Sequence, residues 1–154
     1  MTTQTANAAH GANVDGLTQV LADTFGLYAK THGYHWNVTG PNFAALHGLF
    51  EDQYNEQWSS LDDLAERLRA LGRPAPHLTQ VAPLSQIDTG DLKTEATAMV
   101  EDLLAGQKIV IASLKSALAT PEVEADPSTQ SLLSDRLSAH EKQAWMLRAT
   151  LGVR

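Results

Sequence analysis

A long amphipathic helix between residues 42 and 71 is the feature that most constrains this chain. Its apolar residues recur at spacings of three and four, with one step of seven, which is the period of an α-helix. They are Phe43, Leu46, Phe50, Tyr54, Leu61, Ala65 and Leu68. The sequence therefore predicts one long helix that buries one face.

The same helix carries two pairs of polar residues that can bind metal but that it cannot bring together. His47 and Glu51 are four residues apart, as are Asp62 and Glu66, so each pair projects from one face of the helix. The fifteen residues from His47 to Asp62 separate the two pairs by about 22 Å along the axis. One copy of the helix therefore cannot close both pairs on one metal ion.

A second copy of the helix removes this conflict. An antiparallel copy, related by a two-fold axis between Glu56 and Gln57, places each histidine–glutamate pair opposite the other copy's aspartate–glutamate pair. Such a contact forms two identical sites at once. We therefore expect a site shared by two subunits, and a monomer that has lost metal affinity.

Three further helices are predicted from the same periodicity, over residues 14–38, 94–119 and 127–151. The first is joined to the long helix by only a few residues, so the two must run antiparallel. A segment rich in Pro and Gly, residues 71–91, follows the long helix. Its length suits a crossover from one end of a bundle to the other, with a short helical turn near 82–87.

Four helices with one long crossover describe an all-α, ferritin-like four-helix bundle. We expect this domain over residues 14–152, and a flexible tail over residues 1–13, which are small and polar without periodicity. The di-iron form of this architecture takes ligands within each bundle from Glu-x-x-His motifs. No histidine of this chain has a glutamate three residues before it, so a centre inside one bundle is not expected.

Two histidines near the end of the 14–38 helix are further candidate ligands. His32 and His35 are three residues apart on one face, and the short connection brings His35 close to His47. Two imidazoles and the Glu51 carboxylate then form half of a site suited to iron or another divalent metal that prefers N and O ligands. For either histidine alone, a helix cap or a core group is the more common role. The carboxylate pair alone, Asp62 and Glu66, would more often belong to a solvated acidic face.

Composition excludes several classes of protein. Cysteine is absent, which rules out disulfides and thiolate metal sites and favours a reducing, cytoplasmic setting. We expect no signal peptide and no membrane span, because no apolar run approaches the ~20 residues that a span requires. Eighteen acidic and eleven basic residues give a formal charge of −7. This charge disfavours binding to nucleic acid or anionic lipid, so metal cations are the more natural partner.

Several segments together resemble the Dps family, the miniferritins named as DNA-binding proteins from starved cells. The segments are HWNVTGPNFAALH, LDDLAERLRALG and the terminal HEKQAWMLRATLG. An HW pair is followed by a second histidine after twelve residues, a carboxylate four residues later, and D-x-x-x-E fifteen residues beyond that histidine. The resemblance covers nearly the whole chain outside the tail.

The resemblance implies a hollow dodecamer with di-iron ferroxidase sites at its two-fold interfaces. Such a shell oxidises Fe(II) with hydrogen peroxide, and less efficiently with O2, and stores a ferric oxyhydroxide core that protects against oxidative damage. His35 and His47 match the family's histidine ligands, and Glu51 matches the adjacent carboxylate. Asp62 and Glu66 match the ligands of the partner subunit. Zinc is expected to be able to replace iron.

Three positions beside these ligands also bear on the resemblance. Trp36 matches the family's tryptophan next to the site, where it could intercept a radical. Members often have aspartate where this chain has Glu51, which reaches farther by one methylene group. Some members have lysine at the position of His32, whose role stays open between an additional ligand and a group that supports the ligands.

Two other functions compete with this one. A DNA-compacting nucleoid protein with incidental metal binding needs cationic tails, but residues 1–29 contain no Lys or Arg and the chain ends in a single arginine. Twelve copies at −7 carry −84 in total, so we expect no appreciable direct DNA binding. The other alternative is a shell that binds zinc or another redox-inert ion without turnover.

Fe(II) would need an acidic passage into such a shell. The segment before the last helix offers Glu122, Glu124 and Asp126, with Asp135 farther along. These residues fit the lining of a three-fold pore, and equally an ordinary solvated loop.

Overall fold

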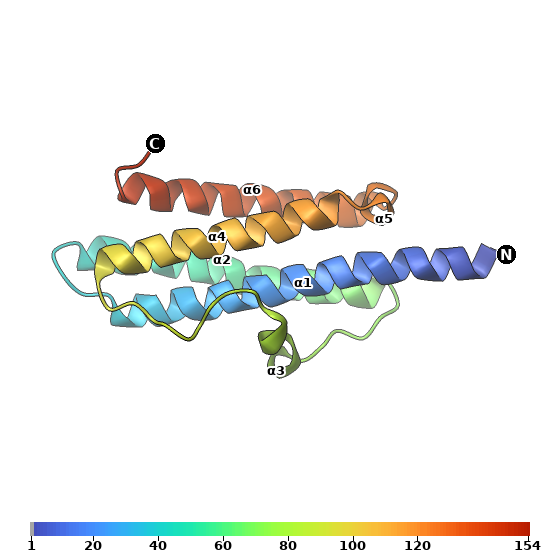
Figure 1. Ribbon diagram of the computed structural model, residues 1–154, viewed down its shortest axis with the longest axis horizontal. Helices are drawn as coiled ribbons and strands as arrows, with labels where there is room; N and C mark the ends of the chain where they lie inside the picture. The colour runs from blue at the N-terminus through green and yellow to red at the C-terminus, as the bar shows by residue number, and fades with distance from the viewer. Residues whose placement is uncertain (1) are drawn as a thin grey trace.

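The computed structural model describes the backbone of residues 2–154 and the side chains of residues 15–154. Within that range the chain is helical and has no strand. The elements are α1 (Thr2–Asn37), α2 (Phe43–Ala70), α3 (Leu78–Val81), the 3-10 helix η1 (Ala82–Leu84), α4 (Ala96–Leu118), α5 (Pro121–Glu124) and α6 (Pro127–Thr150). The long helices α1, α2, α4 and α6 form the bundle, and α3 and η1 lie in the connection between α2 and α4 (Figure 1). The predicted all-α, ferritin-like bundle with a long crossover is confirmed.

Helix α1 begins earlier than the predicted 14–38 helix, because its backbone is helical from Thr2. Met1 and the side chains of residues 2–14 lie outside what the structure describes, and the flexible tail over residues 1–13 stays a prediction. Alanines in this stretch favour helix even without an apolar stripe. Part of the acidic segment after α4 forms the one-turn helix α5, with Pro121 in its first turn. Proline is tolerated there because that position needs no N–H partner.

Among the described residues, no helix combines the length and the apolar content that crossing a bilayer requires. The apolar core lies between α1, α2, α4 and α6, and its largest fully buried members include Leu17, Tyr34, Phe50, Met99 and Leu133. Helix α1 packs mainly against α2 and α4, and α6 packs mainly against α4.

The inward face of α2 is more polar than its apolar pattern predicts. Phe43 is 44% exposed, although it was assigned to the buried stripe. Three polar residues of α2, Gln53, Gln57 and Ser60, are buried. They lie three or four residues apart, on the same helix face as the buried apolar residues.

A ring of hydrogen-bonded polar side chains lies inside the bundle, and Gln57 donates to one of its members, Gln143 (2.8 Å). Arg136 pairs with Glu56 and donates to Nε2 of His140 (3.1 Å), whose Nδ1–H donates to Gln107 (2.8 Å). Gln107 donates to Gln143 (2.7 Å), and Gln143 donates to Glu56 (2.7 Å), which closes the ring. The middle of the bundle therefore holds a connected polar network, in which Arg136 Nε and Gln57 Oε1 are buried without a partner among the described residues.

The crossover is attached to α1 through a buried carboxylate. Asp23 is fully buried and accepts hydrogen bonds from the backbone N–H of Gln86 (2.7 Å) and from Ser113 of α4 (2.5 Å). Gly26 allows close contact here, since a Cβ at this position would overlap the side chain of Ser85. These contacts fix the crossover along the outside of α1.

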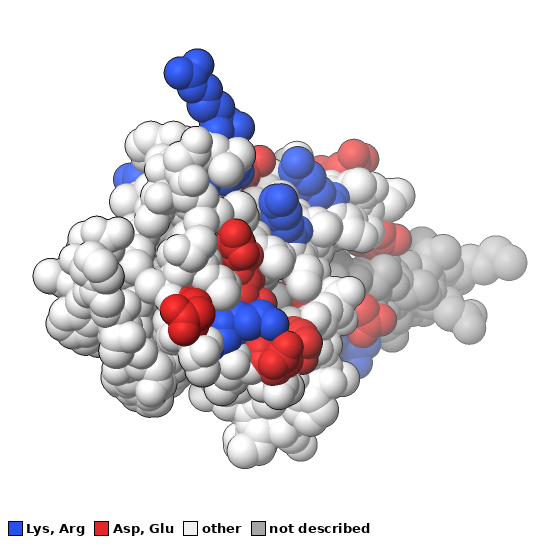
Figure 2. Space-filling view, turned by 60° about the vertical axis from the view of Figure 1, so that its left-hand side comes forward, with Lys and Arg blue, Asp and Glu red and all other residues white. Residues whose placement is uncertain are grey.

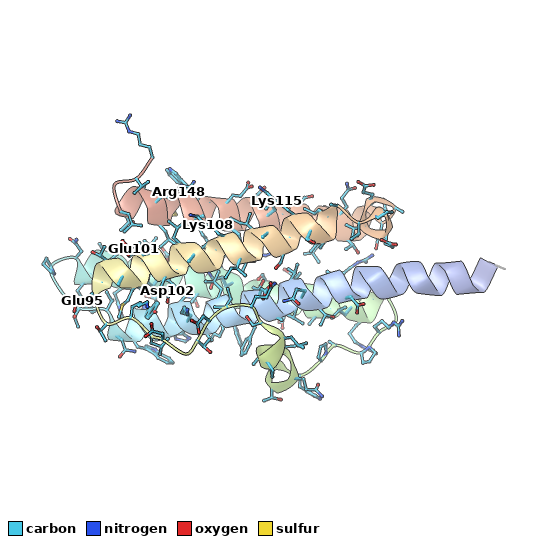
Figure 3. The ribbon with its side chains drawn as sticks, in the orientation of Figure 1. Glu95, Glu101, Asp102, Lys108, Lys115 and Arg148 are labelled. Atoms are coloured by element: carbon cyan, nitrogen blue, oxygen red, sulfur yellow. The ribbon has the colours of Figure 1, made fainter. Side chains whose placement is uncertain are left out.

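A second attachment lies nearer the end of the crossover. Asp102 lies on the side of α4 toward α1 (Figure 3), where it accepts a hydrogen bond from Tyr34 (2.5 Å) and pairs with Lys30 (3.0 Å). The backbone N–H of Lys93 donates to the Tyr34 hydroxyl (3.0 Å). Burial and the bond to Asp102 raise the pKa of Tyr34 to about 12.

Candidate metal site

The site begins with two histidines that the short connection between α1 and α2 brings together. His35 lies in the last turn of α1 and is 8% exposed, and His47 lies in the second turn of α2. Their imidazole rings stack, with centroids 3.7 Å apart and planes 14° from parallel. The sequence-based expectation that these two residues are neighbours is met.

Each of these histidines is held by the backbone of the other. Nδ1 of His35 is 2.8 Å from the carbonyl oxygen of His47, and Nδ1 of His47 is 2.8 Å from the carbonyl oxygen of His35. A carbonyl oxygen can only accept, so both Nδ1 atoms carry the hydrogen. Both Nε2 atoms then keep a lone pair, which is the tautomer that a metal-binding histidine needs.

Aromatic side chains surround this pair. Tyr54 of α2 packs its ring at 5.1 Å from that of His35 and stacks on His32 at 3.9 Å. His32 also packs against Trp36 at 4.3 Å, and its Nδ1 lies 3.0 Å from the Tyr28 hydroxyl. Burial lowers the pKa of His32, and the neighbouring His35 lowers it further. His32 is therefore placed as a neutral neighbour of the pair, and its role as an additional ligand stays a prediction.

The three predicted carboxylate ligands lie on the solvent face of α2. Glu51, Asp62 and Glu66 are all exposed. Among the described residues of one chain, no group of three His, Asp or Glu is gathered closely enough to hold a metal ion. The structure thus brings His35 and His47 together without joining a carboxylate to them, and a site shared between two subunits stays a prediction.

These carboxylates belong to one continuous stripe. Glu51, Asn55, Trp58, Asp62 and Glu66 follow one another at steps of four, three, four and four, and all are exposed. Trp58 is 50% exposed near the centre of this stripe. The outer face of α2 is therefore exposed to solvent from Glu51 to Glu66 in the single chain.

Among the predicted pore residues, Asp126 has a structural partner. Its carboxylate accepts hydrogen bonds from Arg67 of α2 (2.8 Å) and from the Thr129 hydroxyl (2.6 Å), and it caps the N-terminus of α6. Burial raises the pKa of Asp126, but the bonds from Thr129 and Arg67 outweigh burial and lower it to about 2. Glu124 and Asp135 are exposed and Glu122 is half-buried, so their role in a pore stays a prediction.

The polar ring was missed by sequence reasoning. His140 is fully buried, although the charged residues Glu141 and Lys142 follow it in the sequence. Burial, followed by the charge of Arg136, lowers the pKa of His140 to about 3, so the imidazole is neutral. The available signal was the helical spacing of Gln53 and Gln57 with the apolar residues of α2, which marks them as inward-facing.

Comparison with known proteins agrees with this fold. Residues 14–153 match the ferritin-like domain family. The DNA protection during starvation protein 2 of Bacillus anthracis is 33% identical over 140 residues, which cover 90% of this chain and 96% of that protein. The DNA protection during starvation protein of Helicobacter pylori is 32% identical over 139 residues, covering 88% of this chain and 96% of the relative.

Solved structures give the same result. The Dps protein from Vibrio cholerae, described as a ferritin-like diiron-carboxylate protein, superposes with a TM-score of 0.86 at 30% identity, over 94% of this chain and 91% of the other. A Dps protein from Bacillus brevis superposes with a TM-score of 0.86 at 31% identity, over 94% and 97% of the two chains. The chain is thus a ferritin-like protein, and within that class it belongs to the Dps family.

Proposed function

We propose that two copies of this chain pair along the outer face of α2 and form two shared sites that oxidise Fe(II). Each site combines His35, His47 and Glu51 of one subunit with Asp62 and Glu66 of the other. Hydrogen peroxide is the preferred oxidant, and O2 is less efficient. The ferric product is stored as oxyhydroxide inside a dodecameric shell, which removes both reagents of oxidative damage.

One observation carries this proposal: the reciprocal hydrogen bonds that hold His35 and His47 in the metal-binding tautomer. A pair of histidines with only a packing role has no need for both Nε2 lone pairs to stay free. The exposed carboxylates of α2 supply the oxygen ligands. Glu51 lies one turn beyond His47 in the same subunit, and Asp62 and Glu66 come from the other subunit.

The ligand types suit the reaction. Imidazole nitrogen favours Fe(II), and carboxylate oxygen favours the harder Fe(III). Two Fe(II) and one hydrogen peroxide, with two protons, give two Fe(III) and two waters, so no hydroxyl radical is released. The five residues form a weak, displaceable ligand set, and the oxidised iron can therefore leave for the mineral as cargo.

The relatives support the proposal by their descriptions. The Vibrio cholerae protein is described as a diiron-carboxylate protein, and a Listeria innocua Dps protein was soaked with zinc. We therefore extend iron binding to this chain and expect zinc to compete for the same ligands without turnover.

A subunit-mixing experiment tests whether the site is shared. His47→Ala and Asp62→Ala shells are each expected to be inactive with Fe(II) and peroxide. When the two are dissociated and reassembled together, a mixed pair has one intact site and one doubly altered site. Random mixing then restores roughly a quarter of the wild-type sites, measured as ferric absorbance after anaerobic Fe(II) loading.

Two results would contradict the proposal. Activity that stays at zero in mixed shells of the right size means that both residues act within one subunit. Wild-type oxidation rates in either single variant mean that the residue is not a ligand. Size-exclusion chromatography of each sample checks the dodecamer, and parallel runs with O2 in place of peroxide rank the two oxidants.

A further inference from the structure

A row of oxidisable aromatic side chains leads away from the candidate metal site. Starting at His35, the ring of Tyr54 is 5.1 Å away, Tyr28 is 6.2 Å from Tyr54, and Trp58 is 5.0 Å from Tyr28. Each step joins rings in direct or near contact, and the row alternates between α1 and α2. Trp58, at its far end, lies on the outer face of α2.

We propose that Tyr54, Tyr28 and Trp58 form an electron-donating chain that supplies the metal site when only one Fe(II) is bound there. This inference rests on the proposed ferroxidase function. Peroxide needs two electrons to become two waters, and one Fe(II) supplies only one. One-electron reduction would split peroxide into hydroxide and a hydroxyl radical, so a second donor within the site prevents that release.

The reaction balances with tryptophan as the second donor. Hydrogen peroxide, Fe(II), the Trp58 indole and one proton give Fe(III), the neutral indolyl radical and two waters. The indole loses one electron and its N–H proton. Tyr54 and Tyr28 are each oxidised in passing and are reduced again by the next member of the row.

Tyr28 has a place for its proton during this transfer. A phenol gives up its proton when it loses an electron, and Nδ1 of His32 lies 3.0 Å from the Tyr28 hydroxyl. The proton can cross this hydrogen bond and return when Trp58 reduces the phenoxyl radical. Tyr28 is thus paired with a base in the same row of rings.

The position of Trp58 suits the end of such a chain. It is 50% exposed in one chain but lies next to the expected two-fold axis between Glu56 and Gln57. A second copy on the outer face of α2 covers the indole. The indolyl radical of Trp58 is then formed at the covered interface, away from the bound iron and peroxide.

The test uses the assembled full-length protein, loaded anaerobically with one Fe(II) per site and mixed with one equivalent of peroxide. Samples are frozen for EPR, and peptide mass spectrometry locates the oxidised residue. The wild-type protein is expected to show an organic radical and oxidation of Trp58. Tyr54→Phe keeps the ring but removes the oxidisable hydroxyl, so Trp58 oxidation is expected to be lost while a spin trap detects hydroxyl radical.

Two tryptophan variants serve as comparisons. Trp145→Phe alters an exposed tryptophan of α6 that lies outside the row of rings, and it should leave the radical and the oxidation of Trp58 unchanged. Trp36→Phe asks whether the tryptophan next to His35 is the donor instead. Oxidation of Trp36 in place of Trp58, or unchanged Trp58 oxidation in Tyr54→Phe, would overturn the proposed chain.

Full loading separates this inference from the proposed function. If two Fe(II) per site are oxidised by peroxide faster than in His47→Ala, the ferroxidase proposal holds. Absence of Trp58 oxidation at one Fe(II) per site then removes the electron-donating chain alone. If full loading gives no oxidation above that variant, both proposals fail together.

Discussion

Nδ1 of His35 and Nδ1 of His47 each donate a hydrogen bond to the backbone carbonyl of the other residue, at 2.8 Å in both cases. The two residues are twelve positions apart and lie on different helices. This double contact ties the end of α1 to the start of α2 and at the same time selects the tautomer of both rings. The same two hydrogen bonds therefore hold the helices together and leave the Nε2 atom of each histidine with a free lone pair.

Replacing either histidine should therefore affect both properties. His47→Ala is expected to abolish peroxide-driven Fe(II) oxidation and to lower the free energy of unfolding by about 1 to 2 kcal/mol, because a hydrogen bond and ring packing are lost. Glu101→Ala, at an exposed position of α4, is the control and should change neither. Ferric absorbance and thermal unfolding measure the two effects. An active His47→Ala protein would remove this residue from the site.

The bond between Arg67 and Asp126 predicts a pH-dependent contribution to stability. The pKa of Asp126 is lowered from 3.8 to about 2 in the folded chain, so its contribution is complete above the unfolded value and is lost as the pH falls through the folded value. Asp126→Asn should cost about 1 to 2 kcal/mol at pH 7, and the difference from wild type should shrink between pH 4 and 2. Urea unfolding across this range measures it, with Glu124→Gln as the exposed control. A difference that does not change with pH would contradict the assignment.

Asp135 gives a cleaner test of an acidic passage than Asp126, because Asp135 is exposed on α6 and does not cap the helix. Asp135→Asn is expected to slow iron uptake into the shell while leaving its thermal stability within about 0.5 kcal/mol of wild type. Uptake is measured as the rate of mineral formation at saturating peroxide. An unchanged rate would leave these acidic residues as an ordinary solvated surface.

Buried His140 predicts a second pH effect in a different range. Its pKa is lowered from 6.5 to about 3, so between these values the unfolded chain binds more protons than the folded one. Stability is therefore highest above pH 6.5 and falls as the pH falls toward 3, and His140 accounts for about 2 kcal/mol of the loss between pH 7 and 5. His140→Gln should be less stable at pH 7 but should lose less on acidification. Equal losses in both proteins would show that His140 is not buried in its neutral form.

The surface charge predicts weak contact with DNA. On the face shown in Figure 2, acidic and basic side chains are interspersed and do not form a continuous basic patch. Because the chain has a formal charge of −7, counterion release from DNA is expected to be small. A mobility-shift assay at ordinary salt, without added divalent cation, should show no complex. A shift that persists under those conditions would contradict this prediction.

The sequence was sufficient to predict the bundle, its crossover and the faces of the long helices, because helical period and rise are local properties of the backbone. The same regularity separates His47 from Asp62 along α2, which is the reason we propose a site shared with a second copy. Sequence was less informative where the pattern was polar. Gln53 and Gln57 are in phase with the core, but both donate hydrogen bonds to Gln143 of α6, which meets them only in the folded chain.

For the candidate site, too, some features were determined by the sequence and others only by the tertiary structure. Residue types and their spacing were determined by the sequence alone, since a helix places residues four apart on one face whatever lies around it. Tertiary structure decided which nitrogen of His35 and His47 stays free, that Asp126 is bound to Arg67, and that aromatic rings extend from His35 to Trp58. Each of these results depends on contacts between different helices, and no local spacing rule specifies the atoms that meet there.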